Sequence, residues 1–394
     1  MHVIALASEP SAGAAYRAEL PVRALQERGH RAEFHVWDQR DEPPPLDYLR
    51  QADVVHMWRL FREPARRLAR ALRDAGVAVV FDNDDDMTRV PKGSPAYKEM
   101  KAARELVAEE LSAMLKLADL VTTTCGELAG RLRRLGGDAR VVENYVETGF
   151  VRERKPAGES VTIGWVAGME HRGDLRSLRL RRTLEALLEE QPHVSLVGVG
   201  LDLGVRSDRY EHREDIPFPE LPDTVAQFDL ALAPIADVSF NRVRSNIKVK
   251  EYAAAGVPWL ASPIGPYKDL GDEQGGRLVP DFGWADALTD IVSDTERREA
   301  LAARAAAWGR TQTVVENVGE WEAVFAEAAA RAGRIVSAPL AGRDAAAVGA
   351  TVGSRGRTII PRPIPQADAP APSGAGDGAP ATPRRGLFRR RASR

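Results

Sequence analysis

Two cations lie at the expected start of one helix and give the sequence its clearest chemical signal. Arg244 and Lys248 belong to the segment NRVRSNIKVKEYAAAGVPWLAS. A helix is expected to open near Ile247 behind an N-cap at Ser245, and Gly256 is a typical C-terminal stop. The exposed N–H groups and the positive end of the dipole at a helix start bind anions. With two added cations, this segment predicts a site that takes a diphosphate.

A carboxylate stands one turn further along the same helix. Glu251 is three residues beyond Lys248 and therefore lies on roughly the same face. Its carboxylate can accept hydrogen bonds from the hydroxyls of a ribose behind the phosphate site. The alternative is an exposed ion pair between Lys248 and Glu251 on a surface helix. Lys250 is expected to point elsewhere.

An acidic run follows a buried strand in VVFDNDDDMTRVP. Its members are Asp82, Asp84, Asp85 and Asp86. Three interpretations remain open: a divalent metal site, an acceptor site with one carboxylate near a reacting hydroxyl, and capping of the helix expected to begin near Pro95. An EF-hand does not fit, because Met87 replaces the loop glycine and no glutamate stands twelfth.

The elements that must position these residues alternate between strands and helices. In the first part of the chain the expected strands cover 2–7, 31–37, 52–58, 77–84 and 118–124, and the expected helices cover 15–29, 62–76 and 95–117. This alternation predicts an α/β fold with a doubly wound parallel sheet. Ligands of such sheets bind beyond the carboxyl ends of the strands, where the acidic run should lie.

A second series of the same kind begins at residue 161. Its expected strands cover 161–168, 193–200, 229–235 and 257–263, and its expected helices cover 180–191, 221–228 and 247–256, followed by helical stretches at 284–309 and 316–333. We therefore predict four parts: an acceptor-side domain over 1–150, a donor-side domain over 151–312, a C-terminal helix over 313–336 that packs back toward the first domain, and a disordered tail over 337–394.

With these elements in place, FNRVRSNIKVKEYAAAGVPWLASPIGPY resembles the donor-binding segment of retaining glycosyltransferases of the GT-B fold, family 4 and its relatives. VTIGWVAGMEHRGDL is similar to the strand and loop that open the second domain of that family. EPSAGAAYRAELP looks like the family's first loop, although it is not a GxGxxG motif. The resemblance covers most of residues 1–335 and implies two Rossmann-like domains that face a central cleft.

The resemblance also implies roles for individual residues. On the donor side these are Arg244 and Lys248 against the diphosphate, Glu251 on the ribose, His171 and Arg172 in the loop after Gly168, and the helix start at Ser245, Asn246 and Ile247. On the acceptor side they are Gly13, Tyr16, Arg17, Asp82, Asp84 and Asp85. Many relatives carry a second glutamate eight positions before Glu251, where this chain has Val243. A histidine in a polar loop is otherwise usually just solvated.

The mechanism that the resemblance implies is sugar transfer from a nucleoside-diphosphate-sugar to a glycan or other hydroxyl acceptor, with retention at the anomeric carbon. The leaving phosphate itself would accept the proton of the acceptor. Basic residues and the helix dipole would stabilise the diphosphate, so that neither a cofactor nor a divalent metal is expected. The alternatives are a noncatalytic nucleotide-sugar-binding protein and an epimerase or phosphorylase on the same architecture.

Composition places further limits on the class of protein. The chain has 394 residues, of which 44% are hydrophobic, enough for two ordinary domains. Its single cysteine, Cys125, excludes an internal disulfide framework and fits a reducing compartment. The apolar run at the N-terminus is too short for a signal peptide, and no segment reaches the length of a membrane span. We expect a cytoplasmic protein.

The end of the chain differs in charge from the rest. From Arg343 onward there are ten arginines against three aspartates, a local charge of +7 that leaves −9 on residues 1–342. The final RRGLFRRRASR is either an unstructured solubilising end or a weak contact with anionic lipid at the inner face of the membrane, at ~1 kcal/mol per basic residue. The acidic remainder argues against nucleic acid as a partner.

Overall fold

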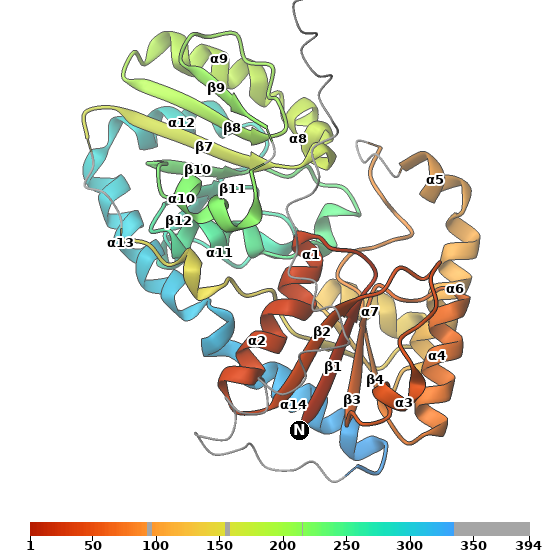
Figure 1. Ribbon diagram of the computed structural model, residues 1–394. Coiled ribbons are helices and arrows are strands. Elements are labelled where there is room, and N and C mark those ends of the chain that lie inside the picture. The colour runs from red at the N-terminus through yellow and green to blue at the C-terminus, as the bar shows by residue number, and fades with distance from the viewer. Residues whose placement is uncertain (93–96, 154–157, 215, 335–394) are drawn as a thin grey trace, which may run out of the picture. The chain divides into compact units, whose positions relative to one another are not determined.

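The computed structural model describes residues 1–92, 97–153, 158–214 and 216–334, and contains two six-stranded parallel sheets (Figure 1). The predicted α/β class with two doubly wound sheets is confirmed. Pro95 and the whole predicted tail lie outside the described residues. None of the helices in these ranges combines the length and apolar character needed to cross a bilayer.

The first sheet belongs to the first half of the chain, residues 1–150, and has the order β2-β1-β3-β4-β5-β6. Its strands are β1 (His2–Ala7), β2 (Arg31–Val36), β3 (Val54–Trp58), β4 (Ala78–Asp82), β5 (Leu120–Thr123) and β6 (Ala139–Val141). Its helices are α1 (Ala12–Ala14), the π-helical η1 (Ala15–Glu19), α2 (Leu20–Glu27), α3 (Leu46–Leu49), α4 (Glu63–Asp74), α5 (Tyr97–Ala102), α6 (Arg104–Leu117) and α7 (Gly126–Arg134).

The second sheet belongs to the second half, residues 151–312, and has the order β12-β11-β10-β7-β8-β9. Its strands are β7 (Val161–Ala167), β8 (Val194–Gly200), β9 (Tyr210–Arg213), β10 (Leu230–Ala233), β11 (Trp259–Ala261) and β12 (Gly276–Leu278). Its principal helices are η3 (Met169–His171), α8 (Arg172–Ser177), α9 (Leu180–Glu190), α10 (Leu221–Val225), η5 (Asn241–Val243), α11 (Ile247–Ala254), α12 (Trp284–Ser293) and α13 (Thr295–Thr311).

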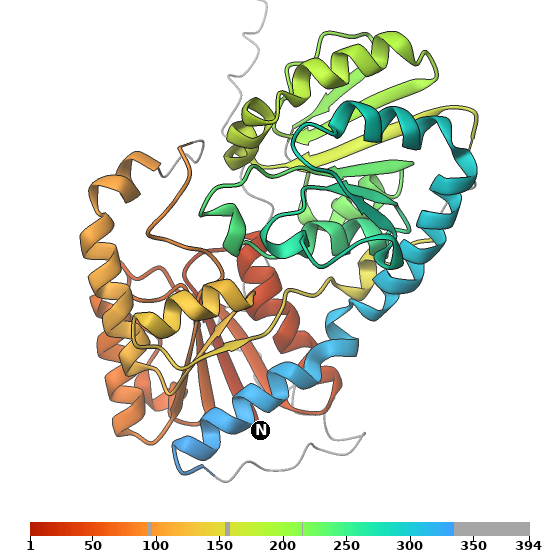
Figure 2. The same cartoon turned by 180° about the vertical axis from the view of Figure 1, so that it is seen from behind.

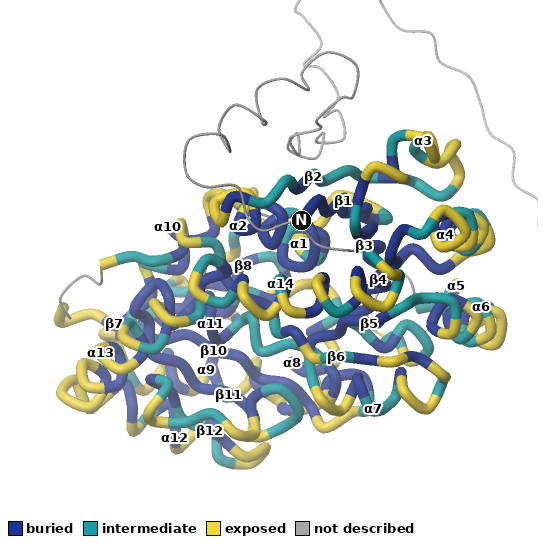
Figure 3. The backbone as a smooth tube through the Cα atoms, turned by 90° about the horizontal axis from the view of Figure 1, so that it is seen from below, coloured by how far each residue is buried: buried dark blue, intermediate teal, exposed yellow. Residues whose placement is uncertain are grey.

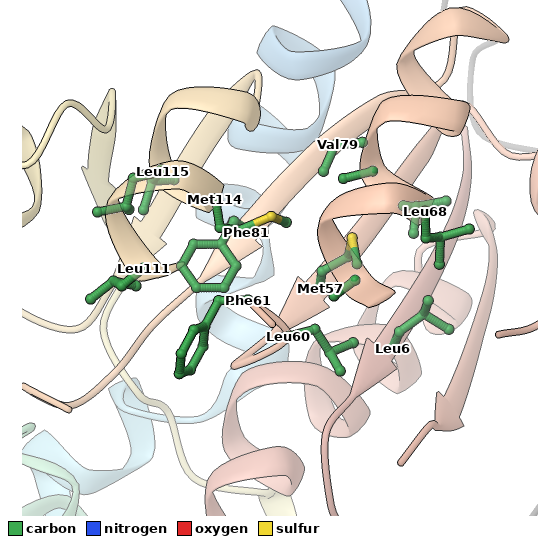
Figure 4. Close-up of a cluster of buried hydrophobic side chains, with 14 of the residues drawn as sticks. Leu6, Met57, Leu60, Phe61, Leu68, Val79, Phe81, Leu111, Met114 and Leu115 are labelled. Atoms are coloured by element: carbon green, nitrogen blue, oxygen red, sulfur yellow. The ribbon is translucent and has the colours of Figure 1, made fainter. Parts of the chain in front are cut away.

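Apolar side chains on both faces of each strand explain why helices cover both faces of each sheet. In β1, Ile4 and Leu6 point toward the cluster formed with α4 and α6, whereas Val3 and Ala5 point toward α2 and the last helix. Figure 4 shows the first of these clusters, in which Phe81 of β4 lies near Leu111 and Met114 of α6, and Met57 of β3 lies toward Leu68 of α4. The strands form the buried interior and the outer helices expose one side (Figure 3).

The last helix, α14 (Val314–Arg331), packs on the first sheet rather than on the second, which precedes it in the chain (Figure 2). Its start pairs with the connection between the halves, because Val314 N donates to Val146 O at 2.8 Å. Trp321 and Phe325 from α14 then contact the ring of His56 in β3, with centroids 5.3 and 5.5 Å apart. The chain therefore crosses between the halves twice.

Several predicted details need correction. The helix expected over 95–117 is divided at Ala103 into α5 and α6, and the stretch 284–309 is divided at Asp294, whose side chain accepts from Arg297 N at 2.9 Å and so caps α13. The sequence does not predict the short strands β6, β9 and β12, because each contains an arginine and lacks the apolar run that marks the equally short β5, β10 and β11.

Candidate functional site

The order of the second sheet reverses between β7 and β10, and the loops after these two strands meet at that point. Asp174, in α8 after β7, joins them: its Oδ1 accepts from Ala236 N at 2.9 Å and from Asn241 Nδ2 at 2.8 Å, both in the loop after β10. Ligands of doubly wound sheets bind at such a reversal, beyond the carboxyl ends of the strands. The second half therefore has its topological switch point here, the place where a ligand is expected.

A chain of three polar side chains leads from this point to the start of α11. Asp174 Oδ2 lies 2.8 Å from His171 Nδ1, and His171 Nε2 lies 3.1 Å from an Arg244 guanidinium nitrogen. Because one neighbour is a carboxylate and the other an arginine, Nδ1 carries the proton and Nε2 accepts from Arg244. Burial, with the positive charge of Arg244, lowers the pKa of His171. The neutral imidazole therefore holds Arg244 in place.

Arg244 also donates to Glu170, with 3.1 Å between the guanidinium nitrogen and Oε1. Burial opposes its charge, but Glu170, with Asp85 and Tyr267, outweighs burial and raises the pKa of Arg244. Glu170 was not among the predicted residues. An acidic residue beside an expected anion site gives no sequence signal of its own, and only the folded loop places it on the arginine.

Lys248 and Glu251 form the predicted i,i+3 pair, with 2.8 Å between Nζ and Oε2. The alternative of a surface ion pair is wrong, because Glu251 is only 2% exposed. Its other oxygen accepts from the Tyr16 hydroxyl of η1 at 2.5 Å, and burial together with Glu251 raises the pKa of Tyr16. Tyr16 and Glu251 are thus brought together from opposite halves of the chain.

The start of α11 differs from its prediction. Asn246, and not Ser245, is the N-cap residue, and its side chain donates to Glu143 Oε2 at 3.1 Å instead of capping the helix. Ser245 Oγ accepts from Asn144 Nδ2 at 3.2 Å, and Ile247 is partly buried. These polar side chains are used for contacts with the end of the first half, and no side chain caps the start of α11.

Lys250 was expected to point away, and the structure shows where it goes. It is completely buried, its Nζ lies 2.7 Å from Glu143 Oε2 and 3.0 Å from Asn144 O, and it stands over the Tyr145 ring at 4.1 Å. Burial lowers the pKa of Lys250 although Glu143 opposes the shift. Lys250 therefore anchors α11 to the first half. The apolar residues on both sides of Lys250 in the sequence indicate that other parts of the chain cover every face of α11.

The loop after β7 contributes two further predicted residues. Gly168 is exposed, and a Cβ at this position would lie 2.4 Å from a carboxylate oxygen of Glu170. Arg172 begins α8 and is exposed, outside the chain formed by Asp174, His171 and Arg244. The structure therefore brings Gly168 next to Glu170, the partner of Arg244, and leaves Arg172 exposed to solvent.

The acidic run divides into residues with different partners. Asp84 and Asp85 bind the same guanidinium, that of Arg59, at 2.7 and 2.6 Å. Burial raises the pKa of Asp84. Arg59 has φ +53°, a left-handed conformation uncommon outside glycine and often found at functional sites. A Cβ on Gly13 would lie 2.7 Å from Trp58 and 3.4 Å from Asp84, so the first loop approaches this cluster closely.

The other two interpretations of the acidic run are a helix cap and a metal site. Asp86 accepts from Thr88 and pairs with Arg131 at 2.6 Å, so it caps a turn and not a helix. Among the described residues, no group of three or more His, Cys, Asp and Glu side chains could hold a metal ion.

Asp82 and Arg17 require a correction. Both are completely buried, and their side chains form an ion pair at 2.6 Å. Asp82 also accepts from the Thr122 hydroxyl at 2.6 Å, and Arg17 lies over the Trp321 ring at 4.7 Å. In this structure they belong to the interior of the first half and do not border an acceptor. A buried arginine–carboxylate pair and an exposed one have the same sequence signature.

Comparison with known proteins identifies the architecture. No model of a known family matches the chain, and no curated protein does. Sucrose-phosphate synthase from Thermosynechococcus elongatus matches with a TM-score of 0.60 at 16% identity, over 83% of this chain and 99% of that one. The structure of HepE from Anabaena in complex with UDP-glucose gives 0.59 at 14%, over 82% and 100%. This chain has the GT-B fold.

A third solved structure shows that the GT-B likeness does not fix the activity. A putative UDP-N-acetylglucosamine 2-epimerase from Listeria monocytogenes matches with a TM-score of 0.52 at 11% identity, over 86% of this chain and 100% of that one. At such identities the likeness is one of fold. The activity must be argued from the residues of this chain.

Val243 occupies the place where many family 4 transferases carry a glutamate, and the structure shows its surroundings. Its side chain is completely buried and belongs to the apolar cluster of the first half. Its carbonyl accepts from Cys125 Sγ at 3.4 Å. An ionised glutamate in this apolar contact would be costly to bury. In this GT-B chain the position joins the two halves instead of facing the switch point.

Proposed function

We propose that this chain is a glycosyltransferase that takes a sugar from a nucleoside-diphosphate-sugar bound at the switch point of the second half. The observation that carries the proposal is the contact of Asp174 with His171 and of His171 with Arg244 at the start of α11. Asp174 and His171, both buried and both after β7, fix one guanidinium from the loop after β10, at the place where the fold binds ligands.

The chemistry of sugar transfer explains why this arrangement is useful. When the bond between the sugar and the diphosphate breaks, negative charge grows on the leaving group, and preorganised cations and N–H dipoles stabilise that charge most effectively. Arg244, Lys248 and the N-terminus of α11 would supply them. In this structure the Tyr16 hydroxyl donates to one oxygen of Glu251. Once that hydroxyl has moved away, Glu251 would bind the ribose hydroxyls.

The acceptor is proposed to bind at the carboxyl edge of the first sheet. The order of that sheet reverses between β1 and β3, and the loops after them carry Gly13 and Arg59. Asp84 and Asp85, held side by side by Arg59, would accept hydrogen bonds from the hydroxyls of the acceptor there. A glycan or another hydroxyl-bearing compound would be the acceptor class.

We also propose retention at the anomeric carbon and independence from a divalent metal. Both rest on the resemblance of residues 240–267 to family 4 transferases. NMR analysis of the first-formed product gives its anomeric configuration, and assays with EDTA test the role of metal. An inverted product or a complete loss of activity in EDTA contradicts the respective proposal.

A second candidate is a noncatalytic protein that binds a nucleotide-sugar. It is favoured by Val243, which leaves the donor sugar without the glutamate that family 4 transferases use. Donor binding with neither transfer nor hydrolysis would support it. An isomerised donor would indicate an epimerase, and a requirement for inorganic phosphate would indicate a phosphorylase.

The proposal predicts that Lys248→Ala lowers turnover by a factor of about 100 or more, because a charge-stabilising group is lost. A thermal-shift screen of nucleoside diphosphates and their sugars first identifies the donor, since a ligand at 100 times its Kd adds ~2.7 kcal/mol of stability. Turnover is then measured with that donor.

The matched control is Lys116→Ala, an exposed lysine of α6 in the first half. It should leave turnover unchanged. Equal turnover of the Lys248→Ala variant and the unmodified chain, with both folded, would remove Lys248 from the site and with it this assignment.

A further inference from the structure

Glu170 occupies the space beside Gly168 that the end of β7 leaves open. Its carboxylate oxygens would lie 2.4 and 2.8 Å from a Cβ at Gly168, so they stand directly against the backbone of that residue. Because glycine has no side chain, a ligand could approach the backbone closely at Gly168. In this structure the carboxylate of Glu170, at the end of a flexible side chain, takes that place. The Glu170 side chain is 32% exposed and therefore has room to turn away.

The same carboxylate is the one partner of Arg244 that can easily be exchanged. On the other side of Arg244, His171 is 8% exposed and is fixed by Asp174. Asp174 is fixed in turn by Ala236 N and Asn241 Nδ2. The guanidinium thus has His171, which the fold fixes, on one side and the partly exposed Glu170 carboxylate at 3.1 Å on the other.

We infer that Glu170 is an internal stand-in for a donor phosphate: its carboxylate occupies Arg244 and the Gly168 backbone in the ligand-free protein and leaves when a diphosphate binds. The inference rests on the proposed function and adds a competitor to its anion site. Carboxylate and phosphate are both natural partners of a guanidinium, so one can replace the other on Arg244.

Electrostatics determines the direction of the effect. Burial opposes the charge of Glu170, but Arg244 more than compensates and lowers the pKa of the carboxyl, so that Glu170 is ionised near neutral pH. A bound diphosphate beside an ionised Glu170 is repelled, and the protein must also give up the pair between Glu170 and Arg244 before the ligand can take its place. Both effects lower the affinity of the unmodified chain for anions.

The test is Glu170→Gln, which keeps the size of the side chain and removes its charge. Titration calorimetry is carried out with inorganic pyrophosphate, with UDP, GDP and ADP, and with UDP-glucose. We expect the Kd for pyrophosphate, and for the nucleoside diphosphate that binds, to fall about tenfold, equivalent to ~1.4 kcal/mol. The attached sugar should not change this ratio, because Glu170 competes with phosphate only.

The control is Glu211→Gln, which removes the same charge from another arginine pair, Glu211 with Arg213 at 2.7 Å on β9. Its Kd values should match those of the unmodified chain. An equal fall in this control would assign the effect to net charge and overturn the inference. Thermal unfolding of each variant verifies that it is folded, and Glu170→Ala should change the affinity in the same direction as Glu170→Gln.

The remaining outcomes separate the inference from the proposed function. Suppose that the unmodified chain binds UDP, GDP or ADP. If Glu170→Gln then binds the same compound with equal or lower affinity, the inference is overturned and the proposed function stays intact. Weaker binding of UDP-glucose alone would make Glu170 a sugar contact and also overturn it. If no diphosphate or pyrophosphate binds to the unmodified chain or to Glu170→Gln, both proposals fail.

Discussion

At the scale of single residues, neighbouring carboxylates of one acidic run have different functions. Asp82 is enclosed in the interior with Arg17, whereas Asp84 and Asp85 share Arg59 at the edge of the first sheet. Alternation along a strand sends successive side chains to opposite faces, and the residues after the strand leave the sheet. Asp84 and Asp85 are therefore the members of the run that we propose for acceptor binding.

Asp82→Asn should therefore lower stability rather than acceptor binding. It leaves the Arg17 guanidinium buried without a compensating charge, which costs ~3–5 kcal/mol. Urea unfolding measures the loss, and the KM for the acceptor of the remaining folded enzyme should be unchanged. Asp38→Asn, in an exposed pair with Arg40, should leave the unfolding midpoint where it is. A normal unfolding curve with a raised KM would return Asp82 to the acceptor site.

At the scale of elements, the position of α11 depends on the close packing of α13 against it. A Cβ at Gly309 would lie 2.4 Å from backbone atoms of Ala253 and Ala254. Backbone atoms cannot turn aside as a side chain does, so this glycine sets how near the two helices come. The donor-side cations are located at the other end of α11, and any shift of the helix moves them.

Gly309→Ala is expected to destabilise the chain by ~1–3 kcal/mol through overpacking and to weaken donor binding. Gly319→Ala is the matched control, since Gly319 is exposed within α14 and a Cβ there would meet only the end of Glu322, at 4.0 Å. It should stabilise the chain by about 1 kcal/mol, because alanine favours helix more than glycine does. Denaturant unfolding gives the free energy of unfolding of both variants. If the two substitutions changed this free energy in the same direction, the proposed packing role of Gly309 would be contradicted.

At the scale of the whole molecule, the last described element is α14, which packs on the first sheet, and Arg334 just after it donates to Gly76 O at 2.7 Å. Trp321 packs over Arg17 and against His56, so that α14 completes the core of the first half. The basic tail follows this helix. Its proposed contact with anionic lipid should therefore be separable from folding and from donor binding.

A chain that ends at Arg334 should keep the unfolding midpoint and the donor Kd of the full chain and lose any binding to vesicles that contain phosphatidylserine. The six arginines of RRGLFRRRASR would contribute ~1 kcal/mol each near an anionic surface, and this attraction should weaken with added salt. Vesicle sedimentation at low and high salt measures it. Equal sedimentation of both chains would refute the lipid contact of the tail.

The sequence by itself determined the α/β alternation, the two parallel sheets and the helix start with its cations. Apolar periodicity, caps and glycine stops act over a few residues, so they can be recognised without a structure. The helix at Ile247 and the pair of Lys248 with Glu251 are of this kind. Their prediction required only local spacing.

The tertiary structure alone decided which polar groups meet. The bond from Tyr16 to Glu251 joins residues 235 positions apart, and Lys250 reaches Glu143 over 107 positions. Burial of Asp82 with Arg17, the valine at 243 in the core of the first half, and the carboxylate of Glu170 on Arg244 likewise depend on how loops and halves pack. Charge and size at one position are the same whether its partner is water or another side chain, and only the fold selects the partner.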